Sequence, residues 1–353
     1  MRRYEQPGPA VGNCKEPVMK RLSYIDRVKG LPIISVVLGH AAWSIGLMDY
    51  NYPYVCYPFN ETAFLYVGIF MQAFFLVSGY VSNFHKDFKT FIIKNIQTII
   101  VPLLTLGFAK QIFEGLLTAD NSLFSMGGVC AFVLNGPLWF LNALFLSRII
   151  YWVVVHALHN RYMRGAVMIA IMIGSIFINH HPNSFPSDYF YWQASLGLCV
   201  FLWIGDEMKQ VRITDKRLLG MGIFYVFLLV LSRFIPILSP VPYDAAKSTL
   251  SYWQIPIDVF YVLSGTALLG WISRKTGQNK FLEYYGQNSL VVYIFNVPVL
   301  CFSAFLTTLI ISPTGKVKSM LYLLVYMALT FIIMTLVIFC CAKRPINILL
   351  GKR

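Results

Sequence analysis

The sequence predicts an all-α polytopic membrane protein with about ten transmembrane helices and both termini in the cytoplasm. The first reason is composition: 57% of the 353 residues are hydrophobic and 12% are charged, whereas soluble domains carry roughly 25% charged residues. The second is that several separate apolar runs approach the ~20 residues that a bilayer-spanning helix needs. The third is positive charge, because basic and cation-poor connections alternate along the chain.

Ten apolar segments are the predicted spans. In chain order they cover residues 29–48, 63–83, 98–117, 137–158, 164–180, 189–206, 218–237, 252–273, 288–311 and 320–342. The first span follows a polar, turn-rich stretch and acts as the insertion signal, so we expect no cleavable signal peptide. We therefore expect a flexible cytoplasmic arm at residues 1–20, one membrane domain at 21–343, and a short basic cytoplasmic tail at 344–353.

The connections between these spans alternate in charge. The segment before the first span is rich in Lys and Arg, whereas the first outer connection, residues 49–62, contains neither. Cationic loops stay in the cytoplasm during insertion, so this alternation orients the whole chain. The net charge of +14 then reflects the Lys and Arg residues of the cytoplasmic connections, which also form a surface for anionic headgroups and ligands. We expect the lipid bilayer, and no nucleic acid, as a partner.

The seven cysteines are dispersed without metal-type spacing, so we expect no metal site. Cys56 and Cys130 both fall in predicted outer loops, where they could pair in an oxidising compartment, although two unpaired thiols are the favoured interpretation. No internal repeat is visible, which argues against an inverted-repeat transporter. The sequence allows a homo-oligomer.

The stretch YIDRVKGLPIISVVLGHAAW, from Tyr24 to Trp43, places one histidine deep in an apolar run. His40 follows Lys29 by eleven positions, so both project from nearly the same helical face, with His40 roughly 16 Å deeper. Asp26 joins that face if the helix begins early, and it could orient Lys29 or Arg27 by pairing. A polar group at this depth is costly unless it faces a cavity or a partner.

Two interpretations of His40 follow. The plain one is a packed histidine that is hydrogen-bonded to a neighbouring helix. The functional one is a general base at the end of a polar channel with a cationic cytoplasmic rim.

The segment RLSYIDRVKGLPIISVVLGH resembles the opening of the acyltransferase 3 superfamily of integral-membrane acyltransferases. In that family, an Arg or Lys, ten intervening residues and a His mark the first span; here they are Lys29 and His40. The motif sequence most resembles that of the branch related to fucose 4-O-acetylase. Further elements resemble the family in the same order: FFLVSGY, FKTFIIKNIQTIIVP, GPLWFLNALF and YGQNSLVVYIFNVPV. The resemblance makes residues 21–343 an acyltransferase membrane domain.

This resemblance implies transfer of an acyl group, usually acetyl from acetyl-CoA, to a hydroxyl of a carbohydrate or lipid-linked glycan in a bacterial inner membrane. His40 is then the general base that activates the hydroxyl, and a covalent acyl-histidine intermediate is an open variant. The phosphates of coenzyme A suit a cytoplasmic cationic rim. The expected rim residues are Arg21, Arg27, Lys29, Lys89 and Lys94.

Several polar residues in the spans are candidates for substrate contacts. Trp139 and Asn142 share a face near the predicted outer end of their span, where Trp also fits an interfacial belt. Ser78 and Gly79 are small residues that fit close helix packing, and Ser78 also fits a substrate contact. Tyr293 and Asn296 lie on one face and could bind substrate or a neighbouring helix.

The sequence departs from the family pattern at two places. The basic stretch often carries two arginines three positions apart, and Lys94 and Gln97 stand there instead, so one phosphate contact is weaker or supplied elsewhere. Asn296 stands where many relatives have a histidine near the end of the penultimate span.

Arg148 and Asp258 are both predicted to lie deep, and a buried ion pair would satisfy each.

Two other functions remain as alternatives. One is a polytopic transporter or exporter with His40 in a proton or substrate pathway, against which the missing repeat and the lack of an Asp/Glu/His relay both count. The other keeps the acyltransferase chemistry with an amine or a small amphiphile as acceptor.

Overall fold

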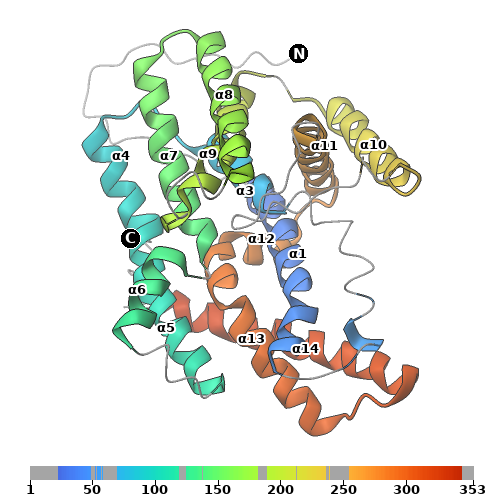
Figure 1. The fold of residues 1–353 in the computed structure, drawn as a ribbon. Helices are drawn as coiled ribbons and strands as arrows, with labels where there is room; N and C mark the ends of the chain where they lie inside the picture. The colour runs from blue at the N-terminus through green and yellow to red at the C-terminus, as the bar shows by residue number, and fades with distance from the viewer. Residues whose placement is uncertain are drawn as a thin grey trace, which may run out of the picture.

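The computed structural model describes residues 23–48, 52, 54–56, 58, 70–118, 125–136, 138–181, 189–211, 213–235, 238 and 254–343. No strand occurs among them, which confirms the all-α class (Figure 1). The main helices are α1 (Ser23–Leu47), α3 (Phe70–Val81), α4 (Phe88–Asn95), the π-helical turn η2 (Ile96–Ile100), α5 (Val101–Thr118), α6 (Met126–Asn135), α7 (Trp139–Ala157), α8 (Arg161–His180), α9 (Trp192–Glu207), α10 (Asp215–Ser232), α11 (Gln254–Lys275), α12 (Lys280–Gln287), α13 (Ser289–Ile310) and α14 (Gly315–Ala342).

Seven stretches of the described chain are helical, long and apolar enough to cross a membrane. They are Ser23–Gly46, Phe88–Phe113, Trp139–Ala157, Arg161–His180, Pro256–Lys275, Ser289–Ile310 and Gly315–Ala342. The other three predicted spans coincide with α3, α9 and α10, which are shorter or, in α10, begin with charged residues. The polytopic class is thus confirmed. The predicted arm at 1–20 and tail at 344–353 lie outside the described residues.

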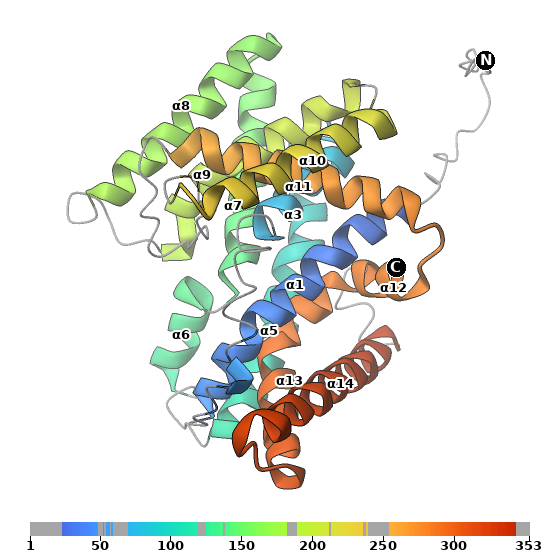
Figure 2. The same cartoon turned by 90° about the vertical axis from the view of Figure 1, so that its right-hand side faces the viewer.

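Helix α1 crosses the middle of the molecule and packs against α3, α11, α12 and α13 (Figure 2). Its crossing with α12 is very close, because a Cβ added at Gly30 would overlap the Leu282 carbonyl, and one at Gly286 would overlap that of Asp26. The backbones touch there, as small residues permit in membrane helices. This crossing fixes the level at which α1 presents its polar face.

Helices α3 and α9 cross in the same manner. A Cβ at Gly79 would overlap the Leu202 carbonyl, and one at Gly205 would overlap that of Leu76. The packing role predicted for Gly79 is therefore confirmed. Because Ser78 is the neighbouring residue, this crossing also determines where Ser78 lies.

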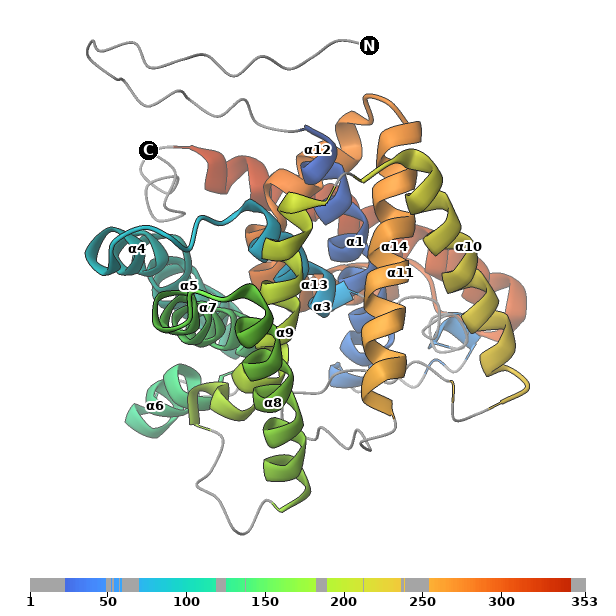
Figure 3. The same ribbon diagram turned by 90° about the horizontal axis from the view of Figure 1, so that it is seen from above.

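Helices α10 and α11 form a pair at one edge of the molecule, opposite α4, α5 and α7 (Figure 3). Tyr225 and Tyr261 belong to a small apolar cluster of their own, separate from the main core around α1, α3, α7, α9 and α13. At its start, α10 is tied to α11 by Asp215, which lies 3.1 Å from the Arg274 guanidinium.

Cys56 and Cys130 both carry free thiols, as favoured above.

Candidate active site

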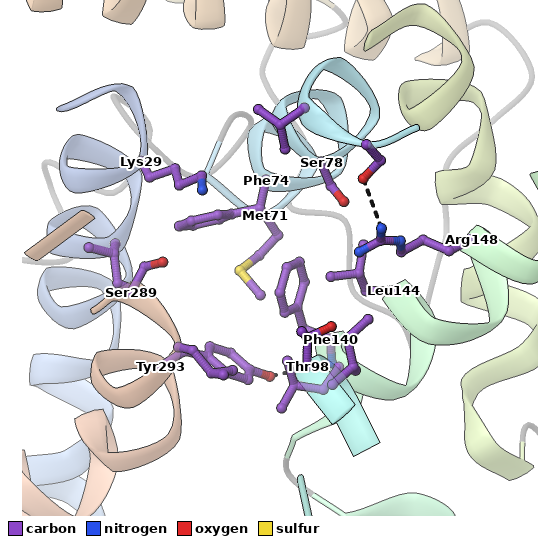
Figure 4. A pocket seen from close by; sticks show the side chains of 16 residues that line it. Lys29, Met71, Phe74, Ser78, Thr98, Phe140, Leu144, Arg148, Ser289 and Tyr293 are labelled. Atoms are coloured by element: carbon purple, nitrogen blue, oxygen red, sulfur yellow. Dashed lines mark hydrogen bonds between the residues drawn. The ribbon is translucent and has the colours of Figure 1, made fainter. Parts of the chain in front are cut away.

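A cavity of about 240 Å³ lies between α1, α3, η2, α7 and α13. Most of its wall is apolar, and its polar atoms come from different helices (Figure 4). None of the lining residues that the structure describes is acidic. They are Lys29, Ile33, Met71, Phe74, Ser78, Val81, Ser82, Thr98, Ile99, Phe140, Leu141, Leu144, Arg148, Ser289, Leu290 and Tyr293.

Three of the residues predicted from the sequence meet in this cavity. Lys29 enters from α1, Ser78 from α3 and Tyr293 from α13 (Figure 4). Ser289, one turn before Tyr293, lies on the same wall as Lys29. The hydroxyl of Tyr293 accepts a hydrogen bond from the Phe140 backbone N–H at 3.3 Å, which links α13 to the first turn of α7.

Arg148 reaches the cavity from the wall opposite Lys29 (Figure 4). Its Nη2 donates to Ser82 Oγ at 2.8 Å. Its Nε is buried and finds no hydrogen-bond partner among the described residues. The predicted ion pair with Asp258 is wrong: Asp258 lies in α11, where its Oδ1 is buried and unpartnered within the same set of residues. Sequence depth alone could not show that α7 and α11 face different neighbours.

A polar network stands behind Ser82. The Lys209 ammonium donates to the Ser82 carbonyl and pairs with Asp206 Oδ1 at 2.6 Å. The Tyr151 hydroxyl donates to the other oxygen of Asp206 at 2.8 Å. Helices α7 and α9 therefore hold the residue that orients the Arg148 guanidinium.

Aromatic rings form one part of the cavity wall. Phe140 lies 5.8 Å from Phe74 and 5.3 Å from Tyr293 between ring centroids, in edge-to-face geometry. Phe75 packs on the same ring at 5.3 Å. Edge-to-face contacts of this kind are favourable, and together these rings form the aromatic wall of the cavity.

His40 does not line the cavity. It lies on the same face of α1 as Lys29 and Ile33, seven residues beyond Ile33. Its Nδ1 is 2.8 Å from the Val36 carbonyl. A carbonyl can only accept, so Nδ1 carries the proton, and the neutral ring has its lone pair on Nε2. That tautomer has the form a general base needs.

Two further side chains lie around the His40 ring. Trp43 packs edge-to-face with it at 5.8 Å. Lys110 of α5, which is 3% exposed, is a charged neighbour of the imidazole. The sequence interpretation missed Lys110, although a lysine inside a predicted span is itself a signal of a functional or paired site.

Arg27, Lys89 and Lys94 do not line the cavity. Arg27 is buried, donates from Nε to the Ser273 carbonyl at 2.8 Å, and forms an ion pair with Glu283. Its guanidinium thus joins α1 to α11 and α12. Lys89 and Lys94 are exposed on α4, and Arg21 lies outside the described residues. Asp26 is buried at the contact with Gly286.

Of the remaining predicted substrate residues, Asn142 and Asn296 are buried and Trp139 is half-buried. Asn142 donates to the Val133 carbonyl at 3.4 Å, and its Oδ1 has no partner within the described chain. Asn296 donates to the Tyr293 carbonyl of its own helix at 2.8 Å. Trp139 begins α7 and packs 6.3 Å from the Tyr191 ring. None of these three lines the cavity.

Arg148 is the main cavity residue that the sequence interpretation placed incorrectly. An arginine inside an apolar span is unusual enough to mark a site, but its position relative to Lys29 depends on the packing of α7 against α3. Ser82, Thr98 and Ser289 also line the cavity, and no local pattern distinguishes them from ordinary polar residues. The described residues contain no cluster of His, Cys, Asp or Glu that could hold a metal ion.

Comparison with known proteins identifies the family. The family model described as an acyltransferase domain matches residues 22–339, nearly the whole chain. The chain therefore belongs to the acyltransferase 3 superfamily and is a membrane acyltransferase. No curated protein and no solved structure matches it.

Proposed function

We propose that this member of the acyltransferase 3 superfamily is an O-acetyltransferase of the bacterial inner membrane. It uses acetyl-CoA as donor and a hydroxyl of a carbohydrate, such as a surface polysaccharide or its lipid-linked precursor, as acceptor. One observation carries the proposal. The same face of α1 presents Lys29 to a cavity without described carboxylates, and presents His40 eleven residues deeper.

The spacing on α1 suits the shape of the donor. At ~1.5 Å per residue, Lys29 and His40 are separated by roughly 16 Å along the helix axis, a distance that an extended pantetheine arm can cover. Lys29 then binds the phosphates at the cytoplasmic end, and the thioester reaches toward His40. Arg21, Lys89 and Lys94 attract the anionic donor to this face. Arg27 is committed to Glu283, so it acts by holding α1 in place.

The reaction needs one base and no covalent intermediate. His40 Nε2 takes the proton of the acceptor hydroxyl while that oxygen attacks the thioester carbonyl carbon. The tetrahedral intermediate collapses by breaking the carbon–sulfur bond, and the imidazolium returns the proton to the departing thiolate. In the covalent variant, Nε2 itself attacks the carbonyl carbon, the carbon–sulfur bond breaks and coenzyme A departs as the thiolate. The acceptor oxygen then attacks the acyl-imidazolium, the carbon–nitrogen bond breaks to release the imidazole, and the hydroxyl proton passes to the thiolate.

The acceptor is expected on the far side of the aromatic wall, near the buried amides of Asn142 and Asn296. A free amide oxygen such as Asn142 Oδ1 can accept from a sugar hydroxyl. Trp139 offers a ring face on which a sugar can stack. Ser78 and Tyr293 lie at the boundary between the donor and acceptor regions.

The test uses purified protein in lipid. Coenzyme A and acetyl-CoA should raise the melting temperature, and radiolabelled acetyl groups should move to a carbohydrate acceptor. His40→Ala should lower the rate of transfer about 10²- to 10⁴-fold, the usual range for a general base, while stabilisation by coenzyme A persists. The exposed Lys216→Gln in α10 serves as control. If neither acetyl-CoA nor coenzyme A raises the melting temperature of active preparations, the assignment of acetyl-CoA as donor is ruled out.

The two alternative functions give different results in the same system. A transporter would move a solute or protons across sealed vesicles without consuming acetyl-CoA. An enzyme acting on an amine or a small amphiphile would consume acetyl-CoA, yet leave the label on a nitrogen or on the lipid-soluble product.

A further inference from the structure

We infer that a second cavity, the crevice between the α10–α11 pair and helices α1 and α3, binds an anionic phospholipid. One acyl chain lies against its apolar walls, and the phosphate lies beside Arg274. The crevice shares no lining residue with the Lys29 cavity. Lipid binding here is therefore independent of the acyl-transfer reaction.

The crevice has room for part of an acyl chain. It measures about 70 Å³ and lies where α11 packs on α1 and α3 (Figure 3). Its walls join two separate apolar clusters, one around Ile25, Val28 and Val77 and the other within the α10–α11 pair. One water-sized group needs ~10–15 Å³ of such space. The crevice therefore takes about five groups of methylene size.

The mouth of the crevice lies at helix ends. Tyr24 is in the first turn of α1, Tyr80 is next to the last residue of α3, and Arg274 is in the last turn of α11. The hydroxyls of the two tyrosines are 3.4 Å apart, and the Arg274 guanidinium lies 5.5 Å from the centre of the Tyr24 ring. Val28 and Val77, one turn further into the spans, line the interior. Aromatic and basic residues gather in this way at the membrane–water interface.

The charge at the mouth is positive. Arg274 is the only charged residue in the described lining. Asp215 lies 3.1 Å from the Arg274 guanidinium and 3.3 Å from the Lys275 ammonium, so one carboxylate faces two cations. Arg274 Nη1 also donates to the Ile213 carbonyl at 3.1 Å. Because a guanidinium carries several N–H groups, Arg274 keeps donors for a phosphate oxygen. This balance favours an anionic headgroup over one that carries a choline cation.

Thr266 gives the crevice a buried polar atom. The residue lines the crevice and is 8% exposed, and its Oγ1 has no hydrogen-bond partner among the described residues. A buried hydroxyl without a partner is costly. Thr266 lies about two turns deeper on α11 than Arg274. The order from cationic mouth to buried donor between apolar walls matches the order of phosphate, ester carbonyl and chain in a phospholipid.

A lipid in the crevice would contact two helices that also line the Lys29 cavity. Val28 and Val77 face the crevice, whereas their neighbours Lys29 and Ser78 line the cavity. The lipid thus fills the space between these helices and α11. A ligand that binds only the folded state stabilises that state, so the lipid should raise the melting temperature.

The experiment titrates phosphatidylglycerol into delipidated full-length protein in detergent and follows the melting temperature. The rise should saturate, phosphatidylcholine should require more lipid, and glycerol 3-phosphate, which has no chain, should have no effect. Arg274→Gln should raise the half-saturating concentration of phosphatidylglycerol about tenfold, as expected for a lost charge-assisted contact. Arg274→Lys should fall between. The matched control is Arg161→Gln, because Arg161 lies 5.4 Å from the Tyr162 ring and 3.8 Å from Glu207 but outside the crevice.

A variant of the buried hydroxyl separates lipid binding from folding. Thr266→Val keeps the shape of the side chain and removes the unpartnered hydroxyl. Without lipid its melting temperature should equal or exceed that of the wild type, and the response to phosphatidylglycerol should weaken. Ser175→Ala, which removes another buried hydroxyl without a described partner, on α8, should leave that response unchanged.

A second interior variant fills the crevice. A Cβ added at Gly270 would meet only the Leu218 side chain, at 3.7 and 3.8 Å, which is ordinary contact. Gly270→Leu should therefore fold, occupy the crevice and abolish the specific response to phosphatidylglycerol. Gly220→Leu, where an added Cβ meets nothing within 4 Å, is the control. If Gly270→Leu lowers the folded yield, Thr266→Val provides the same comparison.

Three results would overturn the inference. The first is a phosphatidylglycerol response in Gly270→Leu or Thr266→Val equal to that of the wild type. The second is equal half-saturation by phosphatidylglycerol and phosphatidylcholine, which would remove the anionic headgroup. The third is stabilisation by oleate at a lower concentration than by phosphatidylglycerol, which would assign the crevice to a free fatty acid.

Discussion

The polar face of α1 has two ends that differ in packing. At Lys29 the face opens into a cavity of about 240 Å³ with Arg148 on its far wall. At His40 the ring is bonded to a carbonyl of its own helix, and the adjacent Val36 and Val37 are 0% and 1% exposed. One end opens into a cavity, whereas at the other end the His40 ring is half-buried and packs against Trp43, which is 52% exposed.

Under the proposed function, the difference between the two ends separates recognition of the donor from chemistry. The Lys29 end already encloses a space, because side chains of α1, α3, η2, α7 and α13 surround it. His40 does not line that space, whose wall includes the rings of Phe74, Phe140 and Tyr293. In the proposed reaction, these rings keep water from the thioester of a bound donor.

The largest expected effect comes from breaking both ends at once. Gly286→Ala places a methyl group against the Asp26 carbonyl at the crossing of α12 with α1. Overpacking of this kind typically costs 1–3 kcal/mol, and here it displaces the helix that carries Lys29 and His40. Melting temperature, donor binding and transfer should fall together. Gly46→Ala, in open space on α1, is the matched control and should change none of them.

The second largest effect should be confined to the Lys29 end of the polar face of α1. Lys29→Gln removes one of the two charges of the cavity, so the KM for acetyl-CoA should rise about tenfold, which corresponds to about 1.4 kcal/mol. The kcat at saturating donor should stay close to that of the wild type, because His40 is untouched. Steady-state kinetics over a range of donor concentrations checks this. A fall in kcat with unchanged KM would place Lys29 in the chemical step.

A smaller effect should appear at the aromatic wall. Phe140→Leu replaces the ring that packs between Phe74 and Tyr293 with a smaller aliphatic side chain, so water should reach the donor more easily. The rate of acetyl-CoA hydrolysis relative to acetyl transfer should rise, and binding of coenzyme A should persist. Hydrolysis measured with and without acceptor tests this. An unchanged ratio would mean that these rings do not separate the donor from water.

The smallest effect lies at the α10–α11 pair, far from both ends of the α1 face. Hydrogen bonds from Arg274 and Lys275 lower the pKa of Asp215 below its usual value. A carboxyl whose pKa is lowered in the folded state stabilises it above the usual carboxyl pKa, and loses that contribution as the pH falls through its own. Because Asp215 is exposed, Asp215→Asn should lower the melting temperature only slightly at neutral pH and not at all in strong acid.

Acyl transfer provides the control for this last variant. Asp215→Asn should leave the transfer rate unchanged, since α10 and α11 contribute no residue to the cavity lining. Loss of transfer in this variant would connect the pair to the catalytic cycle and weaken the contrast between the two regions.

Local sequence patterns were enough to predict much of the fold and part of the candidate site. Hydropathy identified the helical segments, because the energy of an apolar run in a bilayer depends on its own residues. Helical periodicity placed Lys29 and His40 on one face, because that relation lies within a single helix. The ordered motifs also indicated the superfamily that the family match supports.

The partners of the charged residues were decided only by the tertiary structure. Arg27 pairs with Glu283, 256 residues away, and Arg148 with Ser82, 66 residues away. A pairing across such separations depends on which helices pack together, and glycines at the crossings set that packing without any charge pattern in the sequence. The sequence by itself thus determined the helices, the α1 face and the superfamily, whereas helix packing decided that Lys29 shares its cavity with Arg148.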